Sequence, residues 1–325
     1  MNKKIILINL FIFILVCIFV ELFSYCAYFY KYREAITTQW QNGNKVILSY
    51  CRPDLYNPST SPYNYYIIQA QPDNSILHKN FDDSEPIRTF RQNSTKKPIC
   101  FVGCSFTKGS CLTDEETFAY QIAKKTQRTA YLRGVDATGL TQVYYQVKNK
   151  LIPQDSEYVV YTFIYDHLNR LFHYQLGFWS TEINLRYELK NGKLQEAKIK
   201  FPILYSLYST KLIQEKLSNI NSQKEQQDYI LFKAIMADMM QEFKKNYPNS
   251  KFVFLLYEYD DLYDTNLPLD IQNYIKSLGY IYLDANELSG EQLGNIKWKI
   301  KGEGMHPNAE AWKKVAPNFI KVLNL

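Results

Sequence analysis

Ser105 and His306 are the residues of this 325-residue sequence whose surroundings best fit covalent chemistry. Ser105 follows a short apolar run, residues 99–102, which ends at Gly103. A side chain on a turn at the carboxyl end of a buried parallel strand points into a crevice where backbone N–H groups lie nearby. Ser105 is therefore a candidate nucleophile, and the alternative is a serine that only caps the next helix.

His306 has the surroundings of a general base. It precedes an apolar, helix-like run, residues 309–323, and Glu303 stands three residues earlier. A carboxylate can orient an imidazole and offset the positive charge that the ring gains when it takes a proton. The pattern predicts that His306 takes the proton of Ser105 while Glu303 orients His306. The alternative is a loop histidine without a role.

Together the two stretches resemble the first and last sequence blocks of the SGNH, or GDSL-like, hydrolase superfamily. Gly103-Cys104-Ser105 stands where the family has Gly-Asp-Ser, and Glu303 stands where the family usually has aspartate. Glutamate can still accept a hydrogen bond from an imidazole N–H. Thr107 replaces the second glycine of the Gly-x-Ser-x-Gly turn, which disfavours the α/β-hydrolases. The resemblance covers residues 97–325 and implies an acyl-serine intermediate.

The resemblance also implies an oxyanion hole, a set of donors fixed where negative charge develops. In the family these donors are the serine N–H, a glycine N–H after the second strand and an asparagine after the third. Here they correspond to Ser105 and Gly139, with Ala137 as an alternative to Gly139. Gly139 could equally serve only to start the following helix. The third asparagine is missing, and His167 could donate instead. His167 could equally be structural, held by Asp166, or bind a sugar hydroxyl.

Apolar runs alternate between strand-like and helix-like from residue 98 onwards. The predicted strands are 99–102, 130–132, 158–164, 251–257 and 280–283, and the predicted helices are 116–125, 141–150, 226–245, 271–278 and 309–323. This order predicts an α/β fold, a three-layer α/β/α sandwich of SGNH or flavodoxin-like type with a mostly parallel sheet. Residues 183–189 and 194–199 flank Asn191-Gly192 and predict a β-hairpin inserted between the third and fourth strands.

Three regions follow from these patterns. Residues 1–33 are expected to form a cytoplasmic tip and a transmembrane anchor, residues 34–97 a linker and irregular lead-in with five prolines, and residues 98–325 the catalytic domain. The domain carries an insertion at about residues 170–222.

The amino terminus is apolar from residue 5 to residue 30, apart from Glu21, and Lys3 and Lys4 precede it. This length matches the ~20 residues that span a bilayer. No small-x-small cleavage site follows, so we expect an uncleaved single-pass anchor; the alternative is a cleaved signal peptide. We expect the catalytic domain outside the cytoplasm, at a bacterial inner membrane facing the periplasm, which rests partly on the family resemblance.

Composition narrows the partners. The net charge of +6 is too diffuse for nucleic-acid binding, and the histidines do not cluster with other ligands, so neither nucleic acid, a metal nor a cofactor is expected. The 28 tyrosines and 19 phenylalanines can supply core volume and surfaces for sugar rings. The spacing of Cys100, Cys104 and Cys111 allows a disulfide among them but does not establish one.

The sequence thus predicts a serine esterase or O-acyltransferase acting on an extracytoplasmic carbohydrate. Transfer of an acyl group would need a donor supplied by a membrane partner protein. The alternative is a noncatalytic glycan-binding or assembly protein of the same fold. It is suggested by the missing asparagine after the third strand, which would weaken the oxyanion hole.

Overall fold

The structure, a computed structural model, describes residues 3–40, 88–135, 138–171, 185–197, 225–258, 267–301 and 305–325. Its centre is a six-stranded sheet in the order β1-β3-β2-β4-β7-β8, in which every neighbouring pair is parallel except β1 with β3. The strands are β1 (Arg88–Phe90), β2 (Ile99–Gly103), β3 (Ala130–Gly134), β4 (Tyr158–Phe163), β7 (Lys251–Leu256) and β8 (Ile281–Asp284). The predicted mostly parallel sheet is confirmed.

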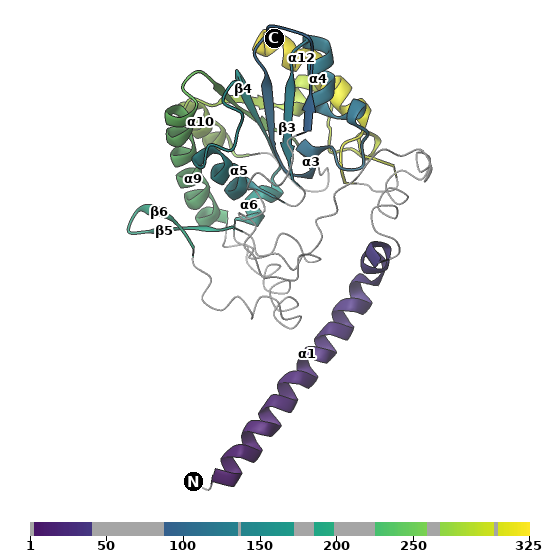
Figure 1. Cartoon of the computed structure of the whole chain (residues 1–325), viewed down its shortest axis with the longest axis vertical. Helices are drawn as coiled ribbons and strands as arrows, with labels where there is room; N and C mark the ends of the chain where they lie inside the picture. Colours follow the sequence, from purple (N-terminus) through teal and green to yellow (C-terminus); the bar gives the residue numbers. More distant parts are fainter. Residues whose placement is uncertain are drawn as a thin grey trace.

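Helices cover both faces of this sheet (Figure 1). Ile99 and Phe101 of β2 belong to one hydrophobic cluster, and the alternate residues Cys100 and Val102 belong to the other. The first cluster includes residues of α4 (Phe118–Thr126), α11 (Ala285–Ser289) and α12 (Ala309–Leu323), and the second those of α5 (Leu140–Lys148), α9 (Glu225–Asn246) and α10 (Leu269–Ser277). Successive side chains of β2 therefore pack into hydrophobic cores on opposite faces of the sheet, and this gives a three-layer sandwich.

Strand β1 corrects the expectation that the chain up to residue 97 is an irregular lead-in. Arg88, Thr89 and Phe90 pair antiparallel with β3 at the edge of the sheet. Phe90 is buried and its ring meets Tyr120 edge-to-face at 5.5 Å between centroids. Edge pairing of three residues leaves too short a pattern to read from sequence, because only one of the three side chains is buried.

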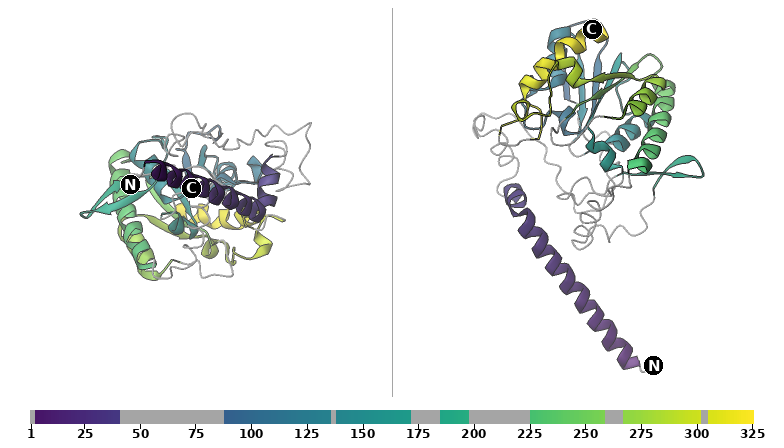
Figure 2. Two further views of the ribbon diagram at one scale, coloured as in Figure 1. Left: turned by 90° about the horizontal axis from the view of Figure 1, so that it is seen from below. Right: turned by 180° about the vertical axis from the view of Figure 1, so that it is seen from behind.

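The predicted hairpin is present as β5 (Tyr187–Lys190) and β6 (Lys193–Glu196), and Figure 2 shows it extending from the side of the domain that carries α9. Its turn residues Asn191 and Gly192 both have positive φ, which asparagine and glycine tolerate best and which suits a two-residue hairpin turn. Tyr187 is buried and meets the ring of Tyr144 edge-to-face at 4.8 Å. One aromatic pair therefore fixes the base of the hairpin to α5.

Helix α1 (Lys3–Trp40) contains one segment, Asn9–Ala27, that is long and apolar enough to cross a membrane. Only 6% of that segment is buried. An apolar helix whose side chains are exposed is expected to lie in lipid, either as an anchor or as a signal sequence.

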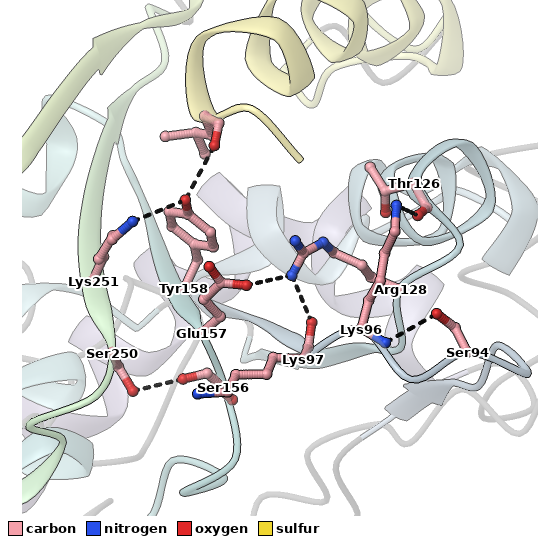
Figure 3. Close-up of polar contacts among 11 residues, drawn as sticks. Ser94, Lys96, Lys97, Thr126, Arg128, Ser156, Glu157, Tyr158, Ser250 and Lys251 are labelled. Carbon is pink, nitrogen blue, oxygen red and sulfur yellow. Dashed lines mark hydrogen bonds and ion pairs between the residues drawn. The ribbon is translucent and has the colours of Figure 1, made fainter.

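The amino ends of the strands are tied by polar contacts (Figure 3). Arg128 donates to Glu157 Oε2 at 2.5 Å and to the carbonyl oxygen of Lys97 at 2.9 Å. The Tyr158 hydroxyl donates to the carbonyl oxygen of Leu323 at 3.1 Å and so ties β4 to the last helix. This end of the sheet is built by structural contacts, while the opposite end carries the candidate site.

Candidate active site

The turn that carries the candidate nucleophile Ser105 follows β2 and starts the four-residue helix α3 (Ser105–Lys108). Gly103 has φ +145°, a conformation that side-chain-bearing residues rarely adopt, and a Cβ there would meet Thr107 Oγ1 at 2.3 Å. Thr107 Oγ1 donates back to the carbonyl oxygen of Val102 at 3.2 Å. The glycine therefore lets the chain reverse sharply, and Ser105 becomes the first residue of a helix at the carboxyl end of a strand.

Two contacts hold α3 in place. Gly134, at the end of β3, lies so close to it that a Cβ would approach Lys108 N to 2.3 Å. Arg88 of the neighbouring strand β1 also donates to the carbonyl oxygen of Lys108 and pairs with Asp114 of the 3₁₀ helix η2 (Asp114–Glu116) at 2.8 Å. The edge strand that the sequence did not reveal therefore supports the helix that carries Ser105.

His306 lies on a segment that is pinned by its backbone. Its carbonyl oxygen accepts from the N–H of Ile300 at 2.9 Å, and Pro307 forms an antiparallel bridge with Lys299 just after the 3₁₀ helix η4 (Ile296–Trp298). Asn308 then caps α12 by accepting from the N–H of Ala311 at 3.0 Å. This pairing fixes the direction in which the imidazole leaves the chain.

The structure brings the two predicted reactive residues together. His306 Nε2 lies 2.8 Å from Ser105 Oγ, and the His306 ring packs on the ring of Phe106 with 5.1 Å between centroids. Ser105 is only 8% exposed. With the proton on Nδ1, Nε2 can accept the hydroxyl proton, which is the geometry of a serine activated by a general base.

The neighbouring thiol does not compete with this serine. Cys104 is fully buried, and its burial raises the pKa of the thiol above its ordinary value. A protonated, inaccessible thiol is a poor nucleophile. Cys104 serves as the N-cap position of α3, where its carbonyl oxygen accepts from the N–H of Lys108 at 2.9 Å.

The third member of the predicted triad, Glu303, lies outside the described residues, as does Ala137. Their roles stay predictions. Gly139 is described, and it forms the N-cap of α5. Its N–H donates to Gln142 Oε1 at 2.8 Å, so this amide must leave Gln142 before it can stabilise an oxyanion.

His167 lies on α6 (Asp166–Arg170), directly after β4, with its side chain fully buried. Its Nδ1 is 2.7 Å from the Tyr161 hydroxyl, and the two rings are parallel with 5.6 Å between centroids. Burial, with a smaller effect of Arg170, holds the pKa of His167 well below its ordinary range, so the ring is neutral. Its Nε2 is buried and has no hydrogen-bond partner among the described residues.

The tautomer of His167 follows from this arrangement. Burial raises the pKa of the Tyr161 hydroxyl, which therefore keeps its proton. If this hydroxyl donates to Nδ1, the only unsatisfied group is an Nε2–H; if it accepts instead, both its own hydrogen and the Nε2 lone pair are unsatisfied. Because each buried unsatisfied group costs ~1–3 kcal/mol, the Nε2–H tautomer is favoured. The Nε2–H of His167 is thus a donor, but it is fully buried, so the residues around it must move before a substrate could reach it; its oxyanion role stays a prediction.

Three further features of the site were not predicted. They are the contact of Tyr161 with His167, the packing of Phe106 on His306, and a bond from Arg170 Nη1 to the carbonyl oxygen of Thr138. Arg170 also pairs with Asp166, four residues earlier, which is a spacing that suits an ion pair on a helix. Among the described residues no group of three His, Cys, Asp or Glu could hold a metal ion.

The disulfide question is partly answered. Cys100 and Cys104 are free thiols, so they do not pair with each other. Cys111 is disulfide-bonded, and its partner lies outside the described residues. The bond therefore ties the chain just after α3 to another part of the sequence.

No protein-family model matches the chain, and no curated protein sequence matches it. The solved structures that match it share few residues with it. A protein assigned as a GDSL-like lipase from Parabacteroides merdae is 13% identical, with 72% of this chain and 99% of that chain covered and a TM-score of 0.43. An acetylxylan esterase from Geobacillus stearothermophilus is 9% identical, with 73% of this chain and 96% of that chain covered and a TM-score of 0.39. A carbohydrate esterase family 2 enzyme from Corynascus thermopiles is 14% identical, with 71% of this chain and 68% of that chain covered and a TM-score of 0.38. All three matches have TM-scores below 0.5 and share no more than 14% of residues with this chain.

Proposed function

We propose that this protein is a membrane-anchored serine esterase or O-acyltransferase that acts on an ester of an extracytoplasmic carbohydrate. Ser105 Oγ attacks the ester carbonyl, and His306 Nε2 takes the hydroxyl proton and returns it to the leaving alcohol. The acyl-serine that forms is then released to water, which gives a free acid, or to a sugar hydroxyl, which gives a new ester.

One observation carries this proposal, the 2.8 Å approach of His306 Nε2 to Ser105 Oγ. A helix-capping serine has no reason to face an imidazole from the other end of the chain. The distance lies within the range expected for a nucleophile and its general base. The carbohydrate part of the proposal comes from the family resemblance of the sequence and needs its own test.

The location outside the cytoplasm has two supports. Residues 9–27 of α1 can span a membrane, and Cys111 is disulfide-bonded. Disulfides persist in oxidising compartments and are rare in the cytosol. A reporter fused after Leu325 should therefore be active only if it functions outside the cytoplasm, and the chain should stay with membranes through alkaline washing. A soluble product that begins after residue 30 would replace the anchor by a cleaved signal sequence.

The nucleophile is tested with Ser105→Ala in the full-length, detergent-solubilised chain. Turnover of p-nitrophenyl acetate and covalent labelling by a fluorophosphonate should both be lost. Ser156→Ala is the matched control, because Ser156 is also buried but its Oγ has no hydrogen-bond partner among the described residues. Turnover that survives in Ser105→Ala would end the proposal.

Hydrolysis and transfer are separated by the fate of the acyl group. The enzyme is offered an activated acetyl ester with and without a panel of oligosaccharides, and the products are followed by mass spectrometry. Acetylated sugar that depends on Ser105 and His306 indicates transfer, since a positioned hydroxyl can outcompete water. Free acetate at an unchanged rate, with no modified sugar, indicates an esterase.

A second candidate, a noncatalytic glycan-binding or assembly protein, is favoured by the state of two predicted oxyanion donors. The Gly139 N–H is bonded to Gln142, and His167 is fully covered. Binding of an oligosaccharide to both wild type and Ser105→Ala, without Ser105-dependent turnover of any ester, would select this candidate.

A further inference from the structure

Arg170 links two loops at the carboxyl end of the sheet. Its Nε and Nη2 each lie 2.7 Å from Asp166 Oδ2, one turn earlier on α6. Its Nη1 donates to the carbonyl oxygen of Thr138, in the loop that follows β3. A guanidinium is suited to this task because its planar fork can satisfy a carboxylate and a carbonyl at the same time.

The link continues to the nucleophile turn. Thr138 is fully buried, and its single hydroxyl proton is shared between the carbonyl oxygens of Val135, 2.8 Å from Oγ1, and Gly103, 3.1 Å from Oγ1. Gly103 also accepts from the N–H of Val135 at 2.9 Å. A chain of hydrogen bonds therefore runs from Asp166 through Arg170 and Thr138 to the residue two positions before Ser105.

The position of these loops explains why such a link matters. Strand β2, which leads to Ser105, lies between β3 and β4, so the loop with Thr138 and the helix with Arg170 flank the nucleophile on opposite sides. Gly139 lies beside Arg170, since a Cβ added to Gly139 would be in ordinary contact, at 3.5 Å, with both Cβ and Cδ of Arg170. Because Arg170 also donates to the carbonyl oxygen of Thr138, movement of Arg170 would release the loop that holds the predicted glycine donor.

We propose that Arg170, held by Asp166, is a positioning residue for the reaction at Ser105: it clamps the backbone at Thr138 and Gly139 against the nucleophile turn. The proposal rests on the proposed function of Ser105. It assigns to Arg170 no contact with substrate, and its effect is on the geometry in which the acyl group is attacked. Misplacement of a reacting group by about 1 Å can slow a reaction roughly 100-fold.

The chain supplies a matched control in Arg128 (Figure 3). Arg128 likewise donates to a carboxylate, that of Glu157, and to a backbone carbonyl oxygen, that of Lys97. Its side chain is 12% exposed and that of Arg170 is 17% exposed, so the two are similarly buried. Arg128 stands at the amino ends of the strands, away from Ser105, and a purely structural arginine should behave as it does.

The test compares Arg170→Met, Arg170→Lys and Arg128→Met in the full-length, detergent-solubilised chain. Melting temperature, kcat and KM for p-nitrophenyl acetate, and the rate of fluorophosphonate labelling are measured. Both methionine variants should lower the melting temperature. Only Arg170→Met should lower kcat and the labelling rate, by roughly 10- to 100-fold with KM within about twofold. Arg170→Lys should recover part of the rate. Equal kcat in Arg170→Met and Arg128→Met, per folded molecule, overturns the proposal.

Two measurements keep the outcome clear. Asp166→Asn keeps the arginine but removes its charged partner, so it replaces Arg170→Met if that variant does not fold, and an unchanged kcat overturns the proposal. Hydrogen exchange does not depend on activity: peptides that contain Gly103 and Gly139 should exchange faster in Arg170→Met than in Arg128→Met. Equal exchange removes the clamp even if Ser105 is the nucleophile. Absence of Ser105-dependent turnover in the wild type removes the proposed function, and with it the role of Arg170 in the reaction, whereas faster exchange in Arg170→Met would still show that Arg170 holds these loops.

Discussion

Replacing Gly134 by alanine should disable the nucleophile more than it destabilises the fold. A Cβ at Gly134 would lie 2.3 Å from Lys108 N, 2.8 Å from Lys108 Cα and 2.9 Å from the carbonyl oxygen of Cys104. These are backbone atoms of the turn and helix that carry Ser105, so no side-chain rotation relieves the overlap. Ordinary contact begins at 3.4 Å, and α3 must therefore move by about 1 Å relative to β3.

The magnitudes follow from that displacement. Overpacking of this kind costs roughly 1–3 kcal/mol, and each kcal/mol lowers the melting temperature of a domain of this size by about 2–4 °C. A shift of about 1 Å in the nucleophile relative to His306 should slow acylation roughly 100-fold. The assay is the rate of fluorophosphonate labelling, read beside thermal unfolding followed by circular dichroism.

Gly139→Ala is the control for this prediction. Its added Cβ would meet Arg170 at 3.5 Å and His167 at 3.7 Å, which is ordinary contact, and Gly139 has an extended backbone that alanine adopts freely. Alanine also keeps the N–H. We expect labelling within a few fold of the wild type. If Gly134→Ala labels as fast as Gly139→Ala, the close approach of α3 to β3 does not position Ser105.

Two further predictions concern stability. Trp312 is fully buried, stacks on Phe118 at 4.7 Å and has an indole N–H without a partner among the described residues, so Trp312→Ala should cost ~3–5 kcal/mol and Trp312→Phe clearly less, as measured by urea unfolding. Burial raises the pKa of Asp284 above its ordinary value of 3.8, so the folded state favours the protonated carboxyl and its contribution to stability is lost as pH rises through the folded-state pKa. Asp284→Asn, which can still accept from the N–H groups of Asn286 and Glu287, should therefore raise the melting temperature at pH 7, and the gain should vanish below about pH 4. A lower melting temperature at pH 7 would contradict this assignment.

The alternation of strands and helices was readable because the inner strands are buried along their length. All six residues of β4 and five of the six residues of β7 are buried, and such apolar runs bounded by polar segments predict strands within one or two residues. Strand β1 was not predicted, because its conformation comes from pairing with β3 and not from its own three residues. The contact by which its Arg88 supports α3 could not be predicted for the same reason.

The candidate site could be predicted where its residues belong to short motifs of consecutive residues. Gly103 to Ser105 and the loop of His306 each carry a local pattern, and the structure joins them. The clamp by Arg170 was not predictable, because its partner Thr138 lies on another loop and accepts through a backbone carbonyl that any residue supplies. The pairing of His167 with Tyr161 likewise depends on the fold of β4 into α6.

The reactive pair also sets an order of events during synthesis. Ser105 and His306 are 201 residues apart, so the hydroxyl is made long before the imidazole. At ~5–20 residues per second, this interval lasts roughly 10–40 s. Under the proposed function, a nascent chain that has not yet reached His306 holds Ser105 without its general base. We therefore expect fragments that end before His306 not to react with a fluorophosphonate.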